Sequence, residues 1–136
     1  MADMENLKTD GNMKSLLHVE DEPIVRDLIQ EVISLKFPCM KIHTAENGKV
    51  GLDLFKKVSP DIVLTDIDLP ILNGILMVSE IRKLNPKAEI IILSGHEKTL
   101  HDSEYVNMGI SYYLKKPISH EVLFDAIEGS LARLTS

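Results

Sequence analysis

Acidic side chains follow two short apolar runs in this chain of 136 residues. Glu20 and Asp21 come directly after the first run, and Asp66 and Asp68 follow a second run over residues 62–65. Carboxylates that converge raise one another's pKa unless a cation neutralises them. An all-oxygen site with few protein ligands suits Mg²⁺, which keeps several waters and shares oxygens with a phosphate group.

A hydroxyl and an ammonium group follow two further apolar runs. Ser94 comes directly after three isoleucines and a leucine, and Lys115 and Lys116 precede Pro117. A lysine and a hydroxyl beside a metal site could hold the oxygens of a phosphoryl group. Taken together, these residue types indicate phosphoryl transfer to a carboxylate, with an aspartate as the nucleophile. Each piece alone also has an ordinary explanation, because acids favour helix N-termini and aspartate favours turns.

Apolar periodicity predicts the elements that must position these side chains. Five strands are expected, over residues 15–19, 41–45, 62–65, 90–93 and 111–114. A segment with helical spacing of apolar residues follows each strand. The first three begin near Pro23, Gly51 and Ile75, and the last covers residues 119–133. The segment over residues 97–108 has only a poor helical pattern. This alternation predicts a doubly wound α/β fold with a five-stranded parallel sheet, whose sites lie at the carboxyl ends of the strands.

Composition restricts the function classes. Fifteen Lys and Arg against 21 Asp and Glu give a net charge of −6, which argues against direct nucleic-acid binding through a basic surface. The single cysteine, Cys39, excludes an intramolecular disulfide and a multi-cysteine zinc site. No apolar stretch approaches the ~20 residues of a membrane span, and no secretory signal is evident. We expect a cytoplasmic chain with a flexible leader over residues 1–13 and one domain over residues 14–134.

At these residues the sequence resembles the receiver domain of bacterial two-component response regulators, of the chemotaxis-Y-like type. The resemblance covers nearly the whole chain, and the matching stretches occur in the family's order. They are residues 17–22, 60–70, 73–74, 91–95 and 112–117. The resemblance implies a flavodoxin-like (βα)5 fold.

The resemblance also implies how the acidic residues would act. Asp66 would be the phosphoacceptor and a metal ligand. Asp21 would bind Mg²⁺ directly, and Glu20, which stands where Asp is frequent, would act through a metal-bound water. The backbone carbonyl of Asp68 would supply a further ligand.

Three further residues would respond to the phosphoryl group. Ser94 matches the switch hydroxyl, and Tyr113 matches the aromatic position that rotates inward when the hydroxyl moves. Lys116, rather than Lys115, would pair with the phosphate because it directly precedes Pro117. In the family this Lys-Pro peptide bond is usually cis.

The resemblance implies a signalling phosphoacceptor that promotes its own phosphorylation and dephosphorylation, not an enzyme that turns over an external substrate. The phosphoryl donor would be a sensor histidine kinase or a phosphotransfer protein. Phosphorylation would alter the face made by residues 97–108, the strand over 111–114 and the last helix, which is also a candidate homodimer surface. The output would be a downstream protein or an output domain missing from this chain.

Two alternatives stay open. Asp66-Ile67-Asp68 is similar to the nucleophile motif of haloacid-dehalogenase-type phosphatases, although that family places the motif after its first strand and its acidic pair near the end. A phosphorylation-independent interaction module would keep the same residues without using them.

Overall fold

The computed structural model describes residues 13–95 and 108–135. Its strands are β1 (Ser15–Val19), β2 (Lys41–Ala45), β3 (Ile62–Asp66), β4 (Glu89–Ser94) and β5 (Tyr112–Lys115). They form one sheet in the order β2-β1-β3-β4-β5, and every neighbouring pair is parallel. The predicted doubly wound five-stranded sheet is therefore confirmed.

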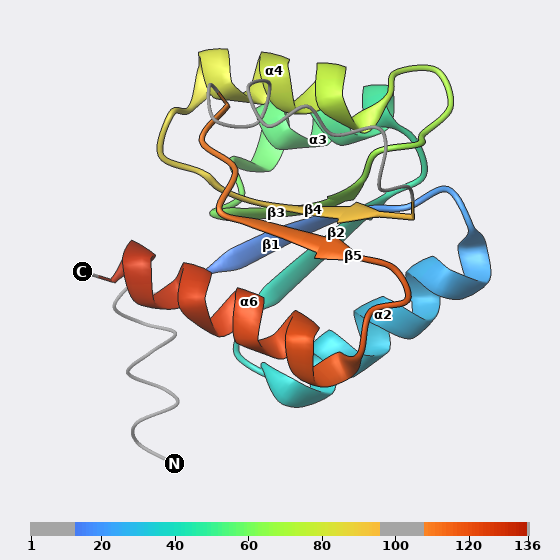
Figure 1. Cartoon of the computed structure of the whole chain (residues 1–136). Coiled ribbons are helices and arrows are strands. Elements are labelled where there is room, and N and C mark those ends of the chain that lie inside the picture. Colours follow the sequence, from blue (N-terminus) through green and yellow to red (C-terminus); the bar gives the residue numbers. More distant parts are fainter. Residues whose placement is uncertain (1–12, 96–107, 136) are drawn as a thin grey trace.

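Helices cover both faces of the sheet. They are α2 (Pro23–Lys36), α3 (Gly48–Val58), α4 (Gly74–Leu84) and α6 (His120–Leu134). Figure 1 shows α3 and α4 on one face and α2 and α6 on the other. The helix expected over residues 97–108 falls outside the described residues apart from Met108, as does the expected leader apart from Met13. None of the described helices is long and apolar enough to cross a membrane.

The alternation of side chains along the strands gives each face its own apolar core. β3 is buried at all five positions, as its continuous apolar run predicts for a central parallel strand. The core under α3 and α4 contains, among others, Leu17, Val19, Val63, Ile90 and Ile92. The core under α2 and α6 contains Leu16, Ile62, Leu64, Ile91 and Leu93 together with helix side chains.

Side-chain caps begin three of the four described helices. Asn47, Asn73 and Ser119 each accept a hydrogen bond from the backbone N–H three residues on, at 2.8, 2.9 and 3.2 Å. α2 begins differently, with Pro23 at its first position and no side-chain hydrogen bond from Glu22. The acids at residues 20–22 lie before the helix and not in its first turn.

Arg82 on α4 fixes the chain just before β5. Its guanidinium donates hydrogen bonds to the backbone carbonyls of Met108 and Gly109, and also to that of Asn85 at the end of its own helix. Gly109 has a φ of 65°, a left-handed conformation that glycine adopts without strain. The segment just before β5 is thereby attached to α4 through two carbonyl oxygens, those of Met108 and Gly109.

Arg133 near the end of α6 binds the same edge of the sheet. Its Nε donates to Glu89 Oε1 at 2.8 Å, and its guanidinium carbon lies 4.9 Å from the centre of the Tyr112 ring. Tyr112 Oη in turn lies directly over Gly129, where a Cβ would collide with it. The first residues of β4 and β5 are therefore held against the last helix, at the edge opposite to the carboxyl ends of the strands.

Candidate functional site

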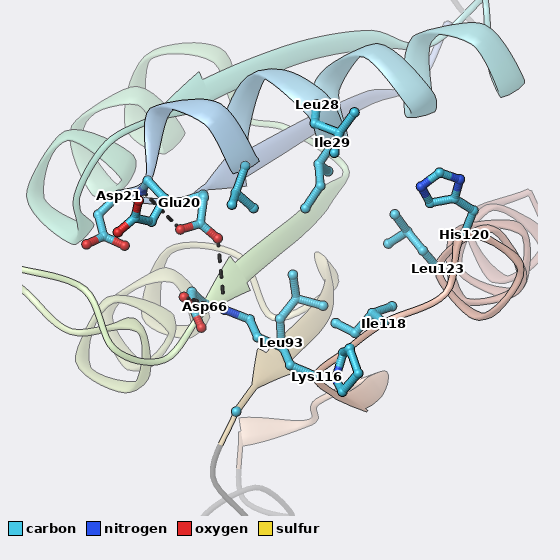
Figure 2. Close-up of a pocket in the computed structure, with 14 residues that line it drawn as sticks. Glu20, Asp21, Leu28, Ile29, Asp66, Leu93, Lys116, Ile118, His120 and Leu123 are labelled. Carbon is cyan, nitrogen blue, oxygen red and sulfur yellow. Dashed lines mark hydrogen bonds and ion pairs between the residues drawn. The ribbon is translucent and has the colours of Figure 1, made fainter.

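The carboxyl ends of β1 and β3 meet at the topological switch point of the sheet, because β2 and β3 lie on opposite sides of β1. Glu20, Asp21 and Asp66 converge there. One carboxylate oxygen of each lies within 4.8 Å of the other two. Figure 2 shows these three side chains beside Lys116. The structure thus brings together the acids that the sequence placed after two different strands.

Glu20 points into the protein, although it follows the last residue of β1. Its residue is 2% exposed, and its Oε2 accepts a hydrogen bond from the Glu22 N–H at 3.1 Å. Its Oε1 is buried and has no hydrogen-bond partner among the described residues. Burial raises the pKa of the Glu20 carboxyl, the Glu22 N–H opposes this shift, and the negative charge of Asp66 adds to it.

Lys116 reaches this cluster from the segment after β5. Its Nζ lies 2.8 Å from Asp66 Oδ2 and 4.0 Å from Glu20 Oε1. Burial by itself lowers the pKa of Lys116, but the hydrogen bond and the charge of Asp66, with those of Glu20 and Asp21, outweigh it and raise the pKa. Lys115 is exposed, and the Lys116–Pro117 peptide bond is cis.

Asp66 and Ser94 end two neighbouring strands. Asp66 is 7% exposed, and its Oδ1 accepts a hydrogen bond from the Ile67 N–H at 3.1 Å. Ser94 is buried at the end of β4, and its carbonyl accepts a hydrogen bond from the Lys116 N–H at 2.7 Å. Ser94 therefore lies between the strand that ends in Asp66 and the segment that carries Lys116.

Tyr113 and Asp68 lie farther from the three carboxylates. Tyr113 is half-buried on β5, pairs with Ile92 of β4, and packs against the core under α3 and α4. Asp68 is exposed in the loop between β3 and α4, and its carboxylate does not belong to the described acidic cluster. The metal role expected for its backbone carbonyl stays a prediction.

The donor set at this edge fits Mg²⁺. Three carboxylates converge, and Glu20 Oε1 is a buried acceptor that no described group satisfies. Hard oxygen donors of this kind are the ligands that Mg²⁺ prefers, and two or three of them leave room for waters and phosphate oxygens.

A cavity of about 630 Å³ opens from the acidic cluster. It lies between α2 and the segment that follows β5, as Figure 2 shows. Its apolar lining includes Val25, Leu28, Ile29, Ile118 and Leu123. The carboxylates thus lie at one end of a groove with largely apolar walls.

A sequence model of the response regulator receiver domain family matches residues 16–128. The chain belongs to this family. Receiver domains are the signalling phosphoacceptors of two-component systems, generally not turnover enzymes, and they act with histidine kinases and output domains. The match gives no support to the haloacid-dehalogenase alternative.

Individual relatives agree with this assignment. The receiver domain is 31% identical to the chemotaxis protein CheY of Halobacterium salinarum, over 87% of this chain and 97% of that protein. It is 34% identical to the transcriptional regulatory protein HptR of Staphylococcus aureus, over 84% of this chain but 44% of that protein. The chain likewise spans about half, 52%, of the transcriptional regulatory protein DegU of Brevibacillus brevis.

Solved structures give the same fold. A response regulator receiver domain protein from Clostridium thermocellum is 28% identical, with a TM-score of 0.82 over 90% of this chain and 98% of that chain. The response regulator TrrA from Thermotoga maritima, solved in complex with Mg²⁺ and BeF, is 30% identical. Its TM-score is 0.78 over 87% of this chain and 99% of that chain.

Two residues of the receiver domain near the site carry features that the sequence did not reveal. Arg26 donates a hydrogen bond to the Glu20 carbonyl at 2.9 Å. The sequence signal that could have indicated this contact is a basic residue one helical turn after the acidic run. His18 lies within β1. It is fully buried, but neither ring nitrogen has a hydrogen-bond partner among the described residues. Burial lowers its pKa to about 4, with Arg26 and Lys116 adding to the shift.

Proposed function

We propose that Asp66 accepts a phosphoryl group from the phosphohistidine of a sensor histidine kinase or a phosphotransfer protein, in a reaction that requires Mg²⁺. One observation carries the proposal: the Asp66 carboxylate is held between the Lys116 ammonium, at 2.8 Å, and two further carboxylates. A nucleophilic carboxylate and a set of metal ligands are the groups that this transfer needs, and the ammonium supplies a partner for a phosphoryl oxygen.

In the proposed step, a carboxylate oxygen of Asp66 attacks the phosphorus atom and forms an acyl phosphate. The bond between phosphorus and the imidazole nitrogen breaks, and that nitrogen takes a proton as the histidine leaves. Lys116 gives up its hydrogen bond with Asp66 Oδ2 and pairs with a phosphoryl oxygen. Asp66, Asp21 and the Asp68 carbonyl would hold Mg²⁺ directly, and Glu20 would hold it through a water. When bound, the ion would neutralise the charge that accumulates on the phosphoryl oxygens.

The remaining residues would convert this local change into a signal. The Ser94 hydroxyl would bind a phosphoryl oxygen, and Tyr113 would rotate inward behind it. Both lie on strands next to the site, Ser94 at the end of β4 and Tyr113 on β5. The altered surface would include β5, α6 and residues 97–108, which lie outside the described residues apart from Met108. A downstream protein, an output domain or a second copy of the chain would read this surface in the cytoplasm.

Labelling with acetyl phosphate tests the proposal without a protein partner. We expect Mg²⁺-dependent incorporation of one phosphoryl group in the wild type, none in Asp66→Asn, and normal incorporation in Asp68→Asn, which keeps its backbone carbonyl. Label that persists at another residue of Asp66→Asn contradicts the assignment. Turnover of p-nitrophenyl phosphate would favour a phosphatase, and a lack of any chemical-shift response to beryllofluoride would favour a phosphorylation-independent module.

A further inference from the structure

Ile71 combines two unfavourable features in the loop between β3 and α4. Its φ is 72°, in the left-handed region that β-branched residues rarely adopt. Its side chain is 77% exposed, so burial does not offset this strain. Glycine or asparagine would adopt the same backbone at lower cost. A β-branched residue at this position therefore does not stabilise the fold.

The backbone around Ile71 is a strained turn. The Leu72 N–H donates a hydrogen bond to the Pro70 carbonyl at 2.7 Å, which closes a three-residue turn with Ile71 at its centre. A turn of this kind with positive φ at the central residue is the rarer and more strained of the two γ-turn forms. It places Ile71 at the tip of the loop. Strain of this kind is concentrated in functional segments of proteins, where the surrounding structure maintains it.

Close packing fixes the turn on both sides. A Cβ at Gly48, the first residue of α3, would collide with the carbonyl oxygen of Leu72. A Cβ at Gly74, the first residue of α4, would collide with the carbonyl oxygen of Asp66, and the Gly74 N–H donates to the Ile67 carbonyl at 2.8 Å. The loop is therefore attached to the acceptor residue itself, and Ile71 loses little conformational freedom when a partner covers it.

Ile71 lies within the area that a phosphoryl donor protein would cover. Ile71 is the fifth residue after Asp66, a path of at most ~18 Å when fully extended, and turns in the loop shorten it. A protein interface of ordinary size buries about 800 Å² on each partner, which reaches ~16 Å from its centre. Figure 1 shows the loop at the carboxyl edge of the sheet, beside the start of α3 and on the same edge as the start of α2.

The opposite side of the acidic site is also apolar and exposed. Ile24, Val25 and Leu28 on the first turns of α2 are 82%, 39% and 53% exposed. Val25 and Leu28 also line the cavity that opens from the carboxylates. Exposed apolar side chains therefore lie on both sides of the acidic site, and exposed apolar patches of this kind mark surfaces that bind other proteins.

We propose that Ile71 is an apolar anchor for the protein that brings the phosphohistidine to Asp66, and that the chain keeps the strained turn to present it. This inference rests on the proposed function. The partner it fits is a histidine-bearing protein with an apolar surface next to the reactive imidazole. A small phosphoryl donor does not need the anchor.

The test compares protein and small-molecule donors. The histidine kinases encoded in the same genome are autophosphorylated with labelled ATP, and the one that transfers fastest to the wild type is used as the probe. Ile71→Asn and Ile71→Gly are compared with Leu35→Gln, which changes an equally exposed side chain (76%) near the other end of α2. Phosphoramidate, which carries a phosphorus–nitrogen bond without a protein, is the second donor.

We expect both Ile71 variants to accept phosphoryl groups from the kinase at least about fivefold more slowly, the effect of losing a modest interface anchor. Their rates with phosphoramidate should equal that of the wild type, and Ile71→Asn should have a higher Tm because strain is relieved. Leu35→Gln should behave as the wild type with both donors. Unchanged kinase transfer, an equal loss with both donors, or a lower Tm of Ile71→Asn would overturn the inference. Labelling by phosphoramidate but by no histidine kinase and no phosphotransfer protein of that genome would instead contradict the donor named in the proposed function.

Discussion

Lys116 Nζ lies 2.8 Å from Asp66 Oδ2 and 4.0 Å from Glu20 Oε1, so one ammonium group contacts carboxylates from the ends of two strands. The lysine comes from the segment after β5, at the far side of β4 from β3. The contact therefore joins β5 to the proposed acceptor across the intervening strand. A phosphoryl group on Asp66 would change the position of this lysine before that of any residue of β5.

Replacing Lys116 should separate folding from switching. Lys116→Ala should fold and accept a label from acetyl phosphate, but lose the beryllofluoride-dependent chemical-shift changes along β5, because the ammonium that follows the phosphoryl group is gone. Lys115→Ala, which removes an exposed neighbour, should switch as the wild type does. Normal switching of Lys116→Ala in NMR spectra would show that this lysine has no part in the mechanism.

Replacing Glu20 should have opposite effects on stability and on metal binding. Burial raises the pKa of Glu20, so its ionised form costs stability near neutral pH in the absence of a metal. We expect Glu20→Gln to raise Tm in EDTA, and to weaken Mg²⁺ binding roughly 10–100-fold, the usual effect of losing an outer-shell partner.

The same shift gives a pH dependence for metal binding. Mg²⁺ affinity of the wild type should fall as pH drops through the raised pKa of Glu20, because the protonated carboxyl no longer attracts the ion. Isothermal titration calorimetry at several pH values measures both effects. An affinity of Glu20→Gln equal to that of the wild type would remove Glu20 from the metal site.

Gly74 should tolerate no side chain. A Cβ there would collide with the carbonyl oxygen of Asp66, which is backbone and cannot rotate away. Gly74→Ala should lower the free energy of unfolding by about 1–3 kcal/mol, as overpacking does elsewhere, and slow labelling by acetyl phosphate. Gly95→Ala is the control, because the nearest neighbour of its Cβ is Lys116 Cδ at 4.0 Å. Equal free energies of unfolding of the two variants, measured in urea, would contradict the collision expected at Gly74.

His18 should make stability depend on pH. Its pKa is lowered to about 4 by burial and by the charges of Arg26 and Lys116, whereas an unfolded histidine titrates near 6.5. Between these values the unfolded chain binds more protons, so this contribution to stability is full above pH ~6.5 and falls as pH decreases towards 4. The loss amounts to ~3 kcal/mol, at 1.36 kcal/mol per pKa unit.

A substitution isolates this contribution. His18→Leu fills a similar volume and removes both buried ring nitrogens that lack partners. Urea unfolding in EDTA between pH 4.5 and 7 should show a smaller loss of stability for this variant than for the wild type. His120→Gln, on the surface, should leave the pH dependence unchanged. If the stability of His18→Leu and that of the wild type changed with pH in parallel, this result would contradict a buried, neutral His18 in the folded protein.

The strands and the location of the site were predictable because both follow from simple patterns. Continuous runs of mostly apolar, β-branched residues, such as residues 62–65, indicate strands buried on both faces, and parallel strands bring their carboxyl ends to one edge. The strand order, by contrast, is not contained in apolar periodicity. The expectation that Glu20, Asp66 and Lys116 meet depended on that order, and the observed β2-β1-β3-β4-β5 sheet supplies it.

Other features could not be predicted because they depend on the path of the chain between elements. Glu20 and Asp21 are adjacent acids, yet Glu20 is buried and Asp21 is exposed. Regular alternation ends with β1, so the sequence does not indicate which of them points inward. Helical spacing correctly placed Val25 and Leu28 on α2, but periodicity does not reveal that part of the apolar stripe is left uncovered. The positive φ of Ile71 is contrary to its residue type.

The two arginines at the amino edge of the sheet restrict how β5 can move. Arg82 holds the backbone just before Tyr112, and Arg133 holds the Tyr112 ring, whereas the other end of the strand carries Lys116. A strand fixed at one end and displaced at the other must tilt, and cannot slide along its neighbour. Movement of β5 should therefore be largest beside the acceptor and smallest at Tyr112, so that a spin label near Lys116 reports on phosphorylation and one near Tyr112 serves as its internal reference.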